Sequence, residues 1–106
     1  MTLYVPILLL AAAVLEVGGD AVIRSGLHGR RPALVLLGMA LLAIYGLTVN
    51  QIRWDFARLL GVYVAVFAAV SVLAGHLVFA ERVPLSTWLG LALILSGGAV
   101  MQFGPR

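Results

Sequence analysis

The chain has 106 residues, of which 63% are hydrophobic and 10% charged, and it has no cysteine. A soluble domain carries roughly 25% charged residues, so this composition excludes an ordinary soluble globular protein. The missing cysteines exclude disulfides and thiolate metal ligands. The net charge is +3, but the basic residues are all arginines scattered near the ends of apolar stretches. That distribution is typical of membrane interfaces and argues against nucleic acid as a partner.

Four apolar stretches of about 17 to 22 residues follow one another along the chain, close to the ~20 residues that cross a bilayer core. None has the polar face that a helix of a soluble bundle would need. We therefore expect an all-α membrane protein with one transmembrane domain over residues 1–106. Its short loops should make consecutive helices antiparallel neighbours. The predicted helices cover approximately residues 3–25, 33–50, 57–80 and 85–103.

The first predicted helix contains the segment AAAVLEVGGDAVIRSG, in which Glu16, Asp20 and Arg24 are spaced four residues apart. Residues at this spacing share one face of a helix. Glu16 lies roughly 20 Å along the helix, well inside a bilayer. Acids at that depth are costly and usually functional. Because the apolar surroundings favour the neutral carboxyl, Glu16 could bind and release a proton, and a cation could compete with that proton for the carboxylate.

Asp20 and Arg24 lie one and two turns beyond Glu16, toward the membrane surface. Arg24 could pair with Asp20 and leave Glu16 as the exchangeable acid. The alternative is that both are ordinary interfacial charges. Gly18 and Gly19 should let another helix or a substrate approach this part of the first helix closely.

Aromatic residues on the second and third helices could complete a pocket around the acid. Tyr63 and Phe67 lie one turn apart and could stack against an organic cation, although packed core aromatics are the more frequent case. Tyr45 on the second helix is a further candidate pocket residue. We therefore predict a proton and substrate site made of Glu16, Tyr63, Asp20 and Tyr45.

The fourth helix contains the segment GLALILSGGAV, which sets small residues seven apart on one face. Small residues allow close approach of helices in membranes. Four helices cannot easily enclose a solvated pathway, so a transporter would need a second copy. The predicted interface of a homodimer comprises Gly90, Leu93, Ile94 and Gly97; packing of these glycines within one chain is the alternative.

The predicted orientation in the membrane is ambiguous. The first and third loops together carry four arginines, against three on the opposite side. This difference is almost too small to set an orientation by the positive-inside rule. The chain could insert in one orientation, or in both to form an antiparallel pair.

Over most of its length the chain resembles the small multidrug resistance family of four-helix transporters. The resemblance rests on AVLEVGGDAVIRSG in the first helix and on VFAERVPLSTWLGLALILSGGAVM over the third loop and fourth helix. It implies an antiparallel homodimer in the bacterial inner membrane that exchanges protons for a hydrophobic or guanidinium-type cation. It also implies that both copies of Glu16 form the shared site and that Gly90 and Gly97 contact the partner copy.

The chain departs from that family at several positions. Tyr63 stands where the family usually has tryptophan, Leu60 stands where it has tyrosine, and Asp20 is an added acid. These differences indicate a divergent branch. The segment GVYVA, residues 61–65, is also similar to a poorly characterised four-helix inner-membrane family that has a first-helix glutamate.

The leading hypothesis is a proton-coupled cation antiporter that works as a homodimer in the lipid bilayer. We expect no enzymatic activity and no cofactor or metal, because the sequence offers no nucleotide loop, metal constellation or activated nucleophile. One alternative is a flippase for lipid-linked substrates, or an accessory subunit, although relatives with such roles lack the first-helix glutamate. Another is a non-transporting assembly partner that docks through its charged stripe.

Overall fold

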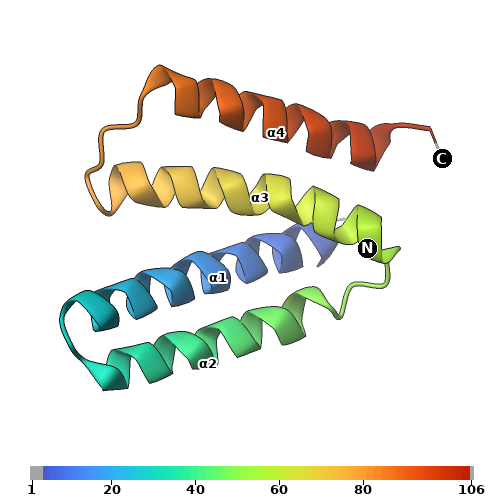
Figure 1. Cartoon of the computed structure of the whole chain (residues 1–106). Coiled ribbons are helices and arrows are strands. Elements are labelled where there is room, and N and C mark those ends of the chain that lie inside the picture. Colours follow the sequence, from blue (N-terminus) through green and yellow to red (C-terminus); the bar gives the residue numbers. More distant parts are fainter. Residues whose placement is uncertain (1–3, 106) are drawn as a thin grey trace. The chain divides into compact units, whose positions relative to one another are not determined.

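The computed structural model describes residues 4–105 as four α-helices arranged in two compact units. In the first unit, α1 (Tyr4–His28) is followed by α2 (Pro32–Val49). In the second unit, α3 (Phe56–Leu77) is followed by α4 (Leu85–Phe103). Each unit is a hairpin of two antiparallel helices joined by a short loop (Figure 1). The described residues contain no strand, which confirms the all-α prediction.

All four helices are long and apolar enough to cross a membrane. Their outward surfaces carry large hydrophobic side chains, including Ile7, Leu47, Leu77 and Leu93, which are 63%, 71%, 72% and 75% exposed. Soluble monomers rarely expose continuous apolar surface of this kind. The prediction of four transmembrane helices is therefore confirmed.

The helices end within three residues of the predicted positions, and local backbone chemistry explains the differences. α2 begins at Pro32, where a missing backbone N–H costs nothing in the first turn. α3 ends at Leu77 rather than near residue 80. The backbone N–H groups of Val78 and Phe79 both donate to the Ala74 carbonyl, at 2.8 and 3.2 Å. Ala80 then adopts the left-handed conformation with φ 52°, which turns the chain away from the helix.

Glycines bring α1 and α2 into backbone contact. A Cβ atom built on Gly19 would lie 2.9 Å from Leu42 Cδ2 and 3.1 Å from the Gly38 carbonyl oxygen. A Cβ built on Gly38 would lie 2.7 Å from the Gly19 carbonyl oxygen and would also overlap Ile23 Cγ1. Close approach of this kind stabilises helix pairs in lipid, where apolar burial gives little driving force. The prediction that Gly19 permits a close helix approach is confirmed.

Glycines also bring α3 and α4 into close contact. A Cβ on Gly98 would lie 2.5 Å from the Ala65 Cβ, and a Cβ on Gly61 would overlap the Met101 sulfur. Gly98 is buried, in line with this contact. Both hairpins are thus held together by small residues that leave no room for a side chain.

Candidate functional site

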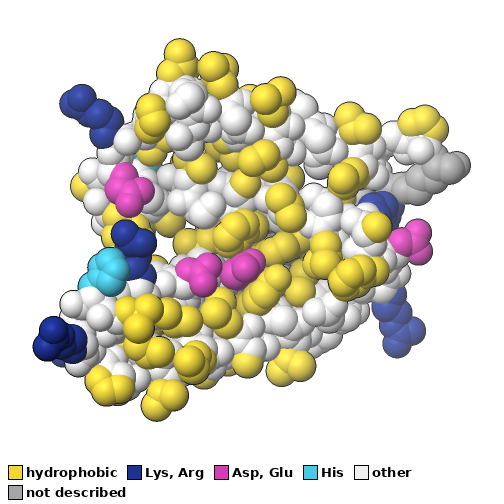
Figure 2. Space-filling view, viewed as in Figure 1, with side chains coloured by type: hydrophobic (Ala, Val, Ile, Leu, Met, Phe, Trp, Pro, Cys, Tyr) yellow, Lys and Arg dark blue, Asp and Glu magenta, His cyan; other side chains and the backbone are white. Residues whose placement is uncertain are grey.

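Glu16 lies midway along α1 on the membrane-spanning part of the helix. It lies twelve positions after Tyr4, which corresponds to about 18 Å at ~1.5 Å per residue. Its side chain is half-buried. In Figure 2 acidic side chains lie midway along α1 among hydrophobic ones, whereas the basic side chains lie toward the helix ends. An acid so placed sits where charge is most costly, as the sequence predicts.

The α1–α2 hairpin brings Tyr45 toward Glu16. The two side chains are close enough for the Glu16 carboxylate to act electrostatically on the Tyr45 phenol. Gly19 lies one turn after Glu16, so the tight Gly19–Gly38 contact fixes the distance between the helices beside the acid. Two of the predicted site residues, one from each helix, are therefore within electrostatic reach of each other in the first unit.

Asp20 lies one turn beyond Glu16 on the same face of α1, and its side chain is exposed. Arg24 is exposed as well, and the structure records no ion pair between Asp20 and Arg24 within residues 4–105. An exposed pair at this spacing gains only a few tenths of a kcal/mol, too little to hold both side chains in one geometry. The pairing that the spacing allowed is not formed.

Tyr63 belongs to the second unit, where it is 3% exposed. Its ring lies against Phe67, with centroids 6.2 Å apart and planes inclined by 31°. This is the aromatic pair that the sequence indicated, one turn apart on α3. The participation of Tyr63 in a shared site with Glu16 remains a prediction.

The predicted dimer face on α4 is exposed within the second unit. Leu93 is 75% exposed and Ile94 41% exposed. A Cβ built on Gly90 or Gly97 would meet no atom within 4 Å, whereas the adjacent Gly98 packs against α3. The role of this face as a homodimer interface remains a prediction.

A half-buried carboxyl within electrostatic reach of a phenol can accept a proton, donate a hydrogen bond once protonated, or pair with a cation. Among the described residues, no three histidine, cysteine, aspartate or glutamate side chains group together as metal ligands. The chemistry that this arrangement offers is reversible binding of a proton or a cation.

Four apolar helices with an acid at mid-membrane depth define a multi-pass α-helical membrane protein. The chain belongs to the YnfA/UPF0060 family, described as "Uncharacterised BCR", whose family model matches residues 2–106. The matching family model does not carry the small multidrug resistance name, so that resemblance remains a prediction.

The relatives are bacterial membrane proteins of nearly the same length. The UPF0060 membrane protein YfjF of Bacillus subtilis is 34% identical over 108 residues, covering 100% of this chain and 99% of the relative. UPF0060 membrane proteins of Saccharopolyspora erythraea and Frankia casuarinae are 34% and 36% identical, covering 94% of this chain and 93% of each relative. No solved structure matches the chain significantly.

Two features of the second unit were not singled out by the sequence analysis. The Arg58 guanidinium lies 4.0 Å from the centre of the Trp54 ring, a cation–π contact at the start of α3. A cavity of about 240 Å³ lies at the α3–α4 connection and is lined by both charged residues of that loop, Glu81 and Arg82. The sequence signal that could have indicated this cavity is the adjacent Glu81 and Arg82 between two apolar helices.

Proposed function

We propose that this protein is a proton-coupled antiporter that exports small hydrophobic or guanidinium-type cations. The observation that carries the proposal is the half-buried Glu16 midway along α1, with Tyr45 of α2 in its electrostatic reach. The resemblance of the first-helix motif to small multidrug resistance transporters supports the same assignment. The proposed role is transport and not catalysis.

In the proposed cycle, Glu16 holds either a proton or a cation. Protonation neutralises the carboxyl and releases the cation, while cation binding stabilises the carboxylate and releases the proton. Because one group serves both ligands, their movements in opposite directions are coupled. Tyr45, within electrostatic reach of Glu16, shapes the pocket together with Tyr63.

The working unit in this proposal is a homodimer in the inner membrane. On α4 each chain exposes Leu93, Ile94 and Gly97, with Gly90 half-buried on the same stripe, and a Cβ on either glycine would meet no atom within 4 Å. Two copies would bring two Glu16 carboxyls and two Tyr63 rings to a common site. If the copies are inserted in opposite orientations, as the near-balanced arginine count allows, exchange of their conformations would alternate access between the two membrane sides.

Flux through proteoliposomes tests the proposal. Vesicles containing the protein are given an outward or inward pH gradient, and uptake of tetraphenylphosphonium or guanidinium is followed. We expect the cation to move in the direction opposite to the proton flux that the gradient drives. This movement should be lost in Glu16→Gln. The matched control is Gly46→Ala on α2, since a Cβ at Gly46 meets no atom within 4 Å. Absence of gradient-driven movement of either cation, or full activity in Glu16→Gln, would reject the proposal and favour a flippase or accessory subunit.

A further inference from the structure

The α3–α4 connection forms a small polar cavity at the end of two membrane-spanning helices. Its volume is about 240 Å³, below the ~300–1,000 Å³ of pockets that enclose a drug-sized molecule. A loop between two spans lies at the level of the lipid headgroups. Glu16, Tyr45 and Tyr63 do not line this cavity. It therefore shares no residue with the proposed transport site.

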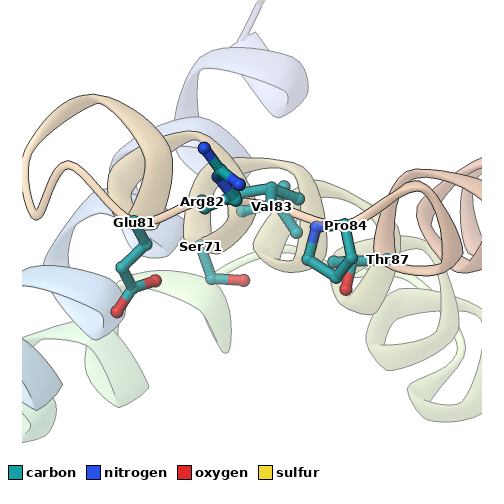
Figure 3. Close-up of a pocket in the computed structure, with 8 residues that line it drawn as sticks. Ser71, Glu81, Arg82, Val83, Pro84 and Thr87 are labelled. Carbon is teal, nitrogen blue, oxygen red and sulfur yellow. The ribbon is translucent and has the colours of Figure 1, made fainter.

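The lining combines two opposite charges, two hydroxyls and an apolar wall. These come from Ser71, Glu81, Arg82, Val83, Pro84 and Thr87 (Figure 3). The Glu81 and Arg82 side chains point to opposite sides of the extended loop backbone. The structure records no ion pair between them within residues 4–105. Their charges are thus held apart, which suits a ligand that carries both signs.

Backbone contacts fix the position of the acid. The Glu81 N–H donates to the Gly75 carbonyl at 2.9 Å, and His76 Nδ1 lies 3.3 Å from the Glu81 carbonyl oxygen. The Glu81 carboxylate packs against Gly75 of α3, since a Cβ built on Gly75 would lie 2.5 Å from Glu81 Oε1 and would displace it. The His76 ring packs edge-on against Trp88, with centroids 6.1 Å apart. A preformed loop of this kind loses little entropy when a ligand binds.

The hydroxyls of Ser71 and Thr87 can bind the two charged groups of such a ligand. Ser71 Oγ donates to the Ala68 carbonyl at 3.0 Å, so its lone pairs remain as acceptors for an ammonium group, together with the Glu81 carboxylate. Thr87 has no recorded hydrogen bond from its hydroxyl within the described residues and can donate to a phosphate oxygen. Thr87 also lies in the first turn of α4, where the helix dipole favours an anion.

We propose that this cavity binds the phosphoethanolamine headgroup of a membrane lipid. Arg82 and Thr87 hold the phosphate, and Glu81 and Ser71 hold the primary ammonium. The acyl chains remain in the bilayer along the apolar surfaces of α3 and α4, which is why a small cavity suffices. This site does not depend on the transport function proposed above.

Native mass spectrometry of the purified protein tests the site, with phosphatidyl-ethanolamine, -choline and -glycerol of identical acyl chains in equal amounts. Choline lipid has the same phosphate but cannot donate from its trimethylammonium, and glycerol lipid has no cation. We expect ethanolamine lipid to be retained about tenfold more than either, the effect of losing one charge-assisted hydrogen bond. Equal retention of all three lipids would overturn the proposal.

Variants assign the two halves of the headgroup. Glu81→Gln should abolish the preference for ethanolamine lipid, and Arg82→Gln should lower retention of all three lipids. Gly75→Ala should act like Glu81→Gln, because the added methyl displaces the carboxylate, while Gly46→Ala should retain the wild-type preference. Far-UV circular dichroism checks that each variant is folded. An unchanged preference in both Glu81→Gln and Gly75→Ala would reject the assignment.

Soluble phosphoethanolamine distinguishes a lipid from a free ligand with the same chemistry. We expect it to compete only at concentrations far above those of the lipid, since it lacks the chains that anchor the headgroup. Competition at equal concentration would overturn the assignment to a lipid.

Discussion

Replacing Gly38 by alanine tests whether close backbone contact holds α1 against α2. The added Cβ would lie 2.7 Å from the Gly19 carbonyl oxygen and 3.0 Å from the Ile23 nitrogen. Atoms in ordinary contact lie about 3.5–4.0 Å apart, so the helices would have to separate by about 1 Å. Overpacking of this kind costs about 1–3 kcal/mol. The equilibrium between folded and unfolded protein should therefore shift about 5- to 150-fold toward unfolding.

The matched variants are Gly19→Ala and Gly46→Ala. At Gly19 the nearest atom is the flexible end of Leu42, at 2.9 Å, so we expect a smaller loss of stability than at Gly38. At Gly46 a Cβ meets no atom within 4 Å, and alanine is the better helix former by about 1 kcal/mol, so this variant should be unchanged or slightly more stable.

Unfolding in mixed micelles of dodecyl maltoside and sodium dodecyl sulfate, followed by far-UV circular dichroism, gives the order of stability. Equal stability of Gly38→Ala and Gly46→Ala would refute the reasoning, because it would mean that the α1–α2 contact does not depend on the missing side chain.

Three further predictions concern the second unit and its loops. Ala80→Gly should raise the free energy of unfolding by about 0.5–1 kcal/mol. An L-residue in the left-handed conformation costs about 1–2 kcal/mol, and the larger conformational entropy of glycine in the unfolded chain offsets part of the gain from removing it. The same micelle assay measures the change, and a loss of stability would contradict the φ of 52°. Arg58→Ala should cost about 0.5–1 kcal/mol and change the emission of Trp54 in a Trp88→Phe background, through loss of the 4.0 Å cation–π contact; an unchanged spectrum would count against that contact. Gly97→Leu should leave helicity intact but weaken association of two copies about tenfold in a fluorescence energy transfer assay, because the side chain points into open space within its own unit; undiminished association would exclude this face as the dimer contact.

The transmembrane helices could be predicted from the sequence because their signal is simple. Each apolar run is about as long as a helix that crosses the bilayer core, and a helix satisfies its backbone hydrogen bonds within the run itself. The end of α3 was harder to predict. Ala80 is apolar and favours helix, and only the paired hydrogen bonds to the Ala74 carbonyl show that the helix stops at Leu77.

The position of Glu16 midway along a membrane-spanning helix could be predicted from the sequence, but its surroundings were harder to predict. Glu16 stands out because an acid inside an apolar run is rare for an energetic reason. Spacing alone could not decide whether Asp20 pairs with Arg24, since a pair four residues apart is permitted but only weakly favoured. The cavity beside Glu81 depends on how the loop folds back against Gly75, a long-range detail that periodicity does not contain.

The central claim is that Glu16 binds a proton and a cation in alternation. Its most direct test is to add cations to the purified protein in weakly buffered solution near neutral pH and to measure whether protons are released. Tetraphenylphosphonium and guanidinium are the probes, and Glu16→Gln and Asp20→Asn are the paired variants. We predict proton release that persists in Asp20→Asn and disappears in Glu16→Gln. No release with either cation, or loss of release only in Asp20→Asn, would contradict the account and assign the acidic stripe of α1 to another role.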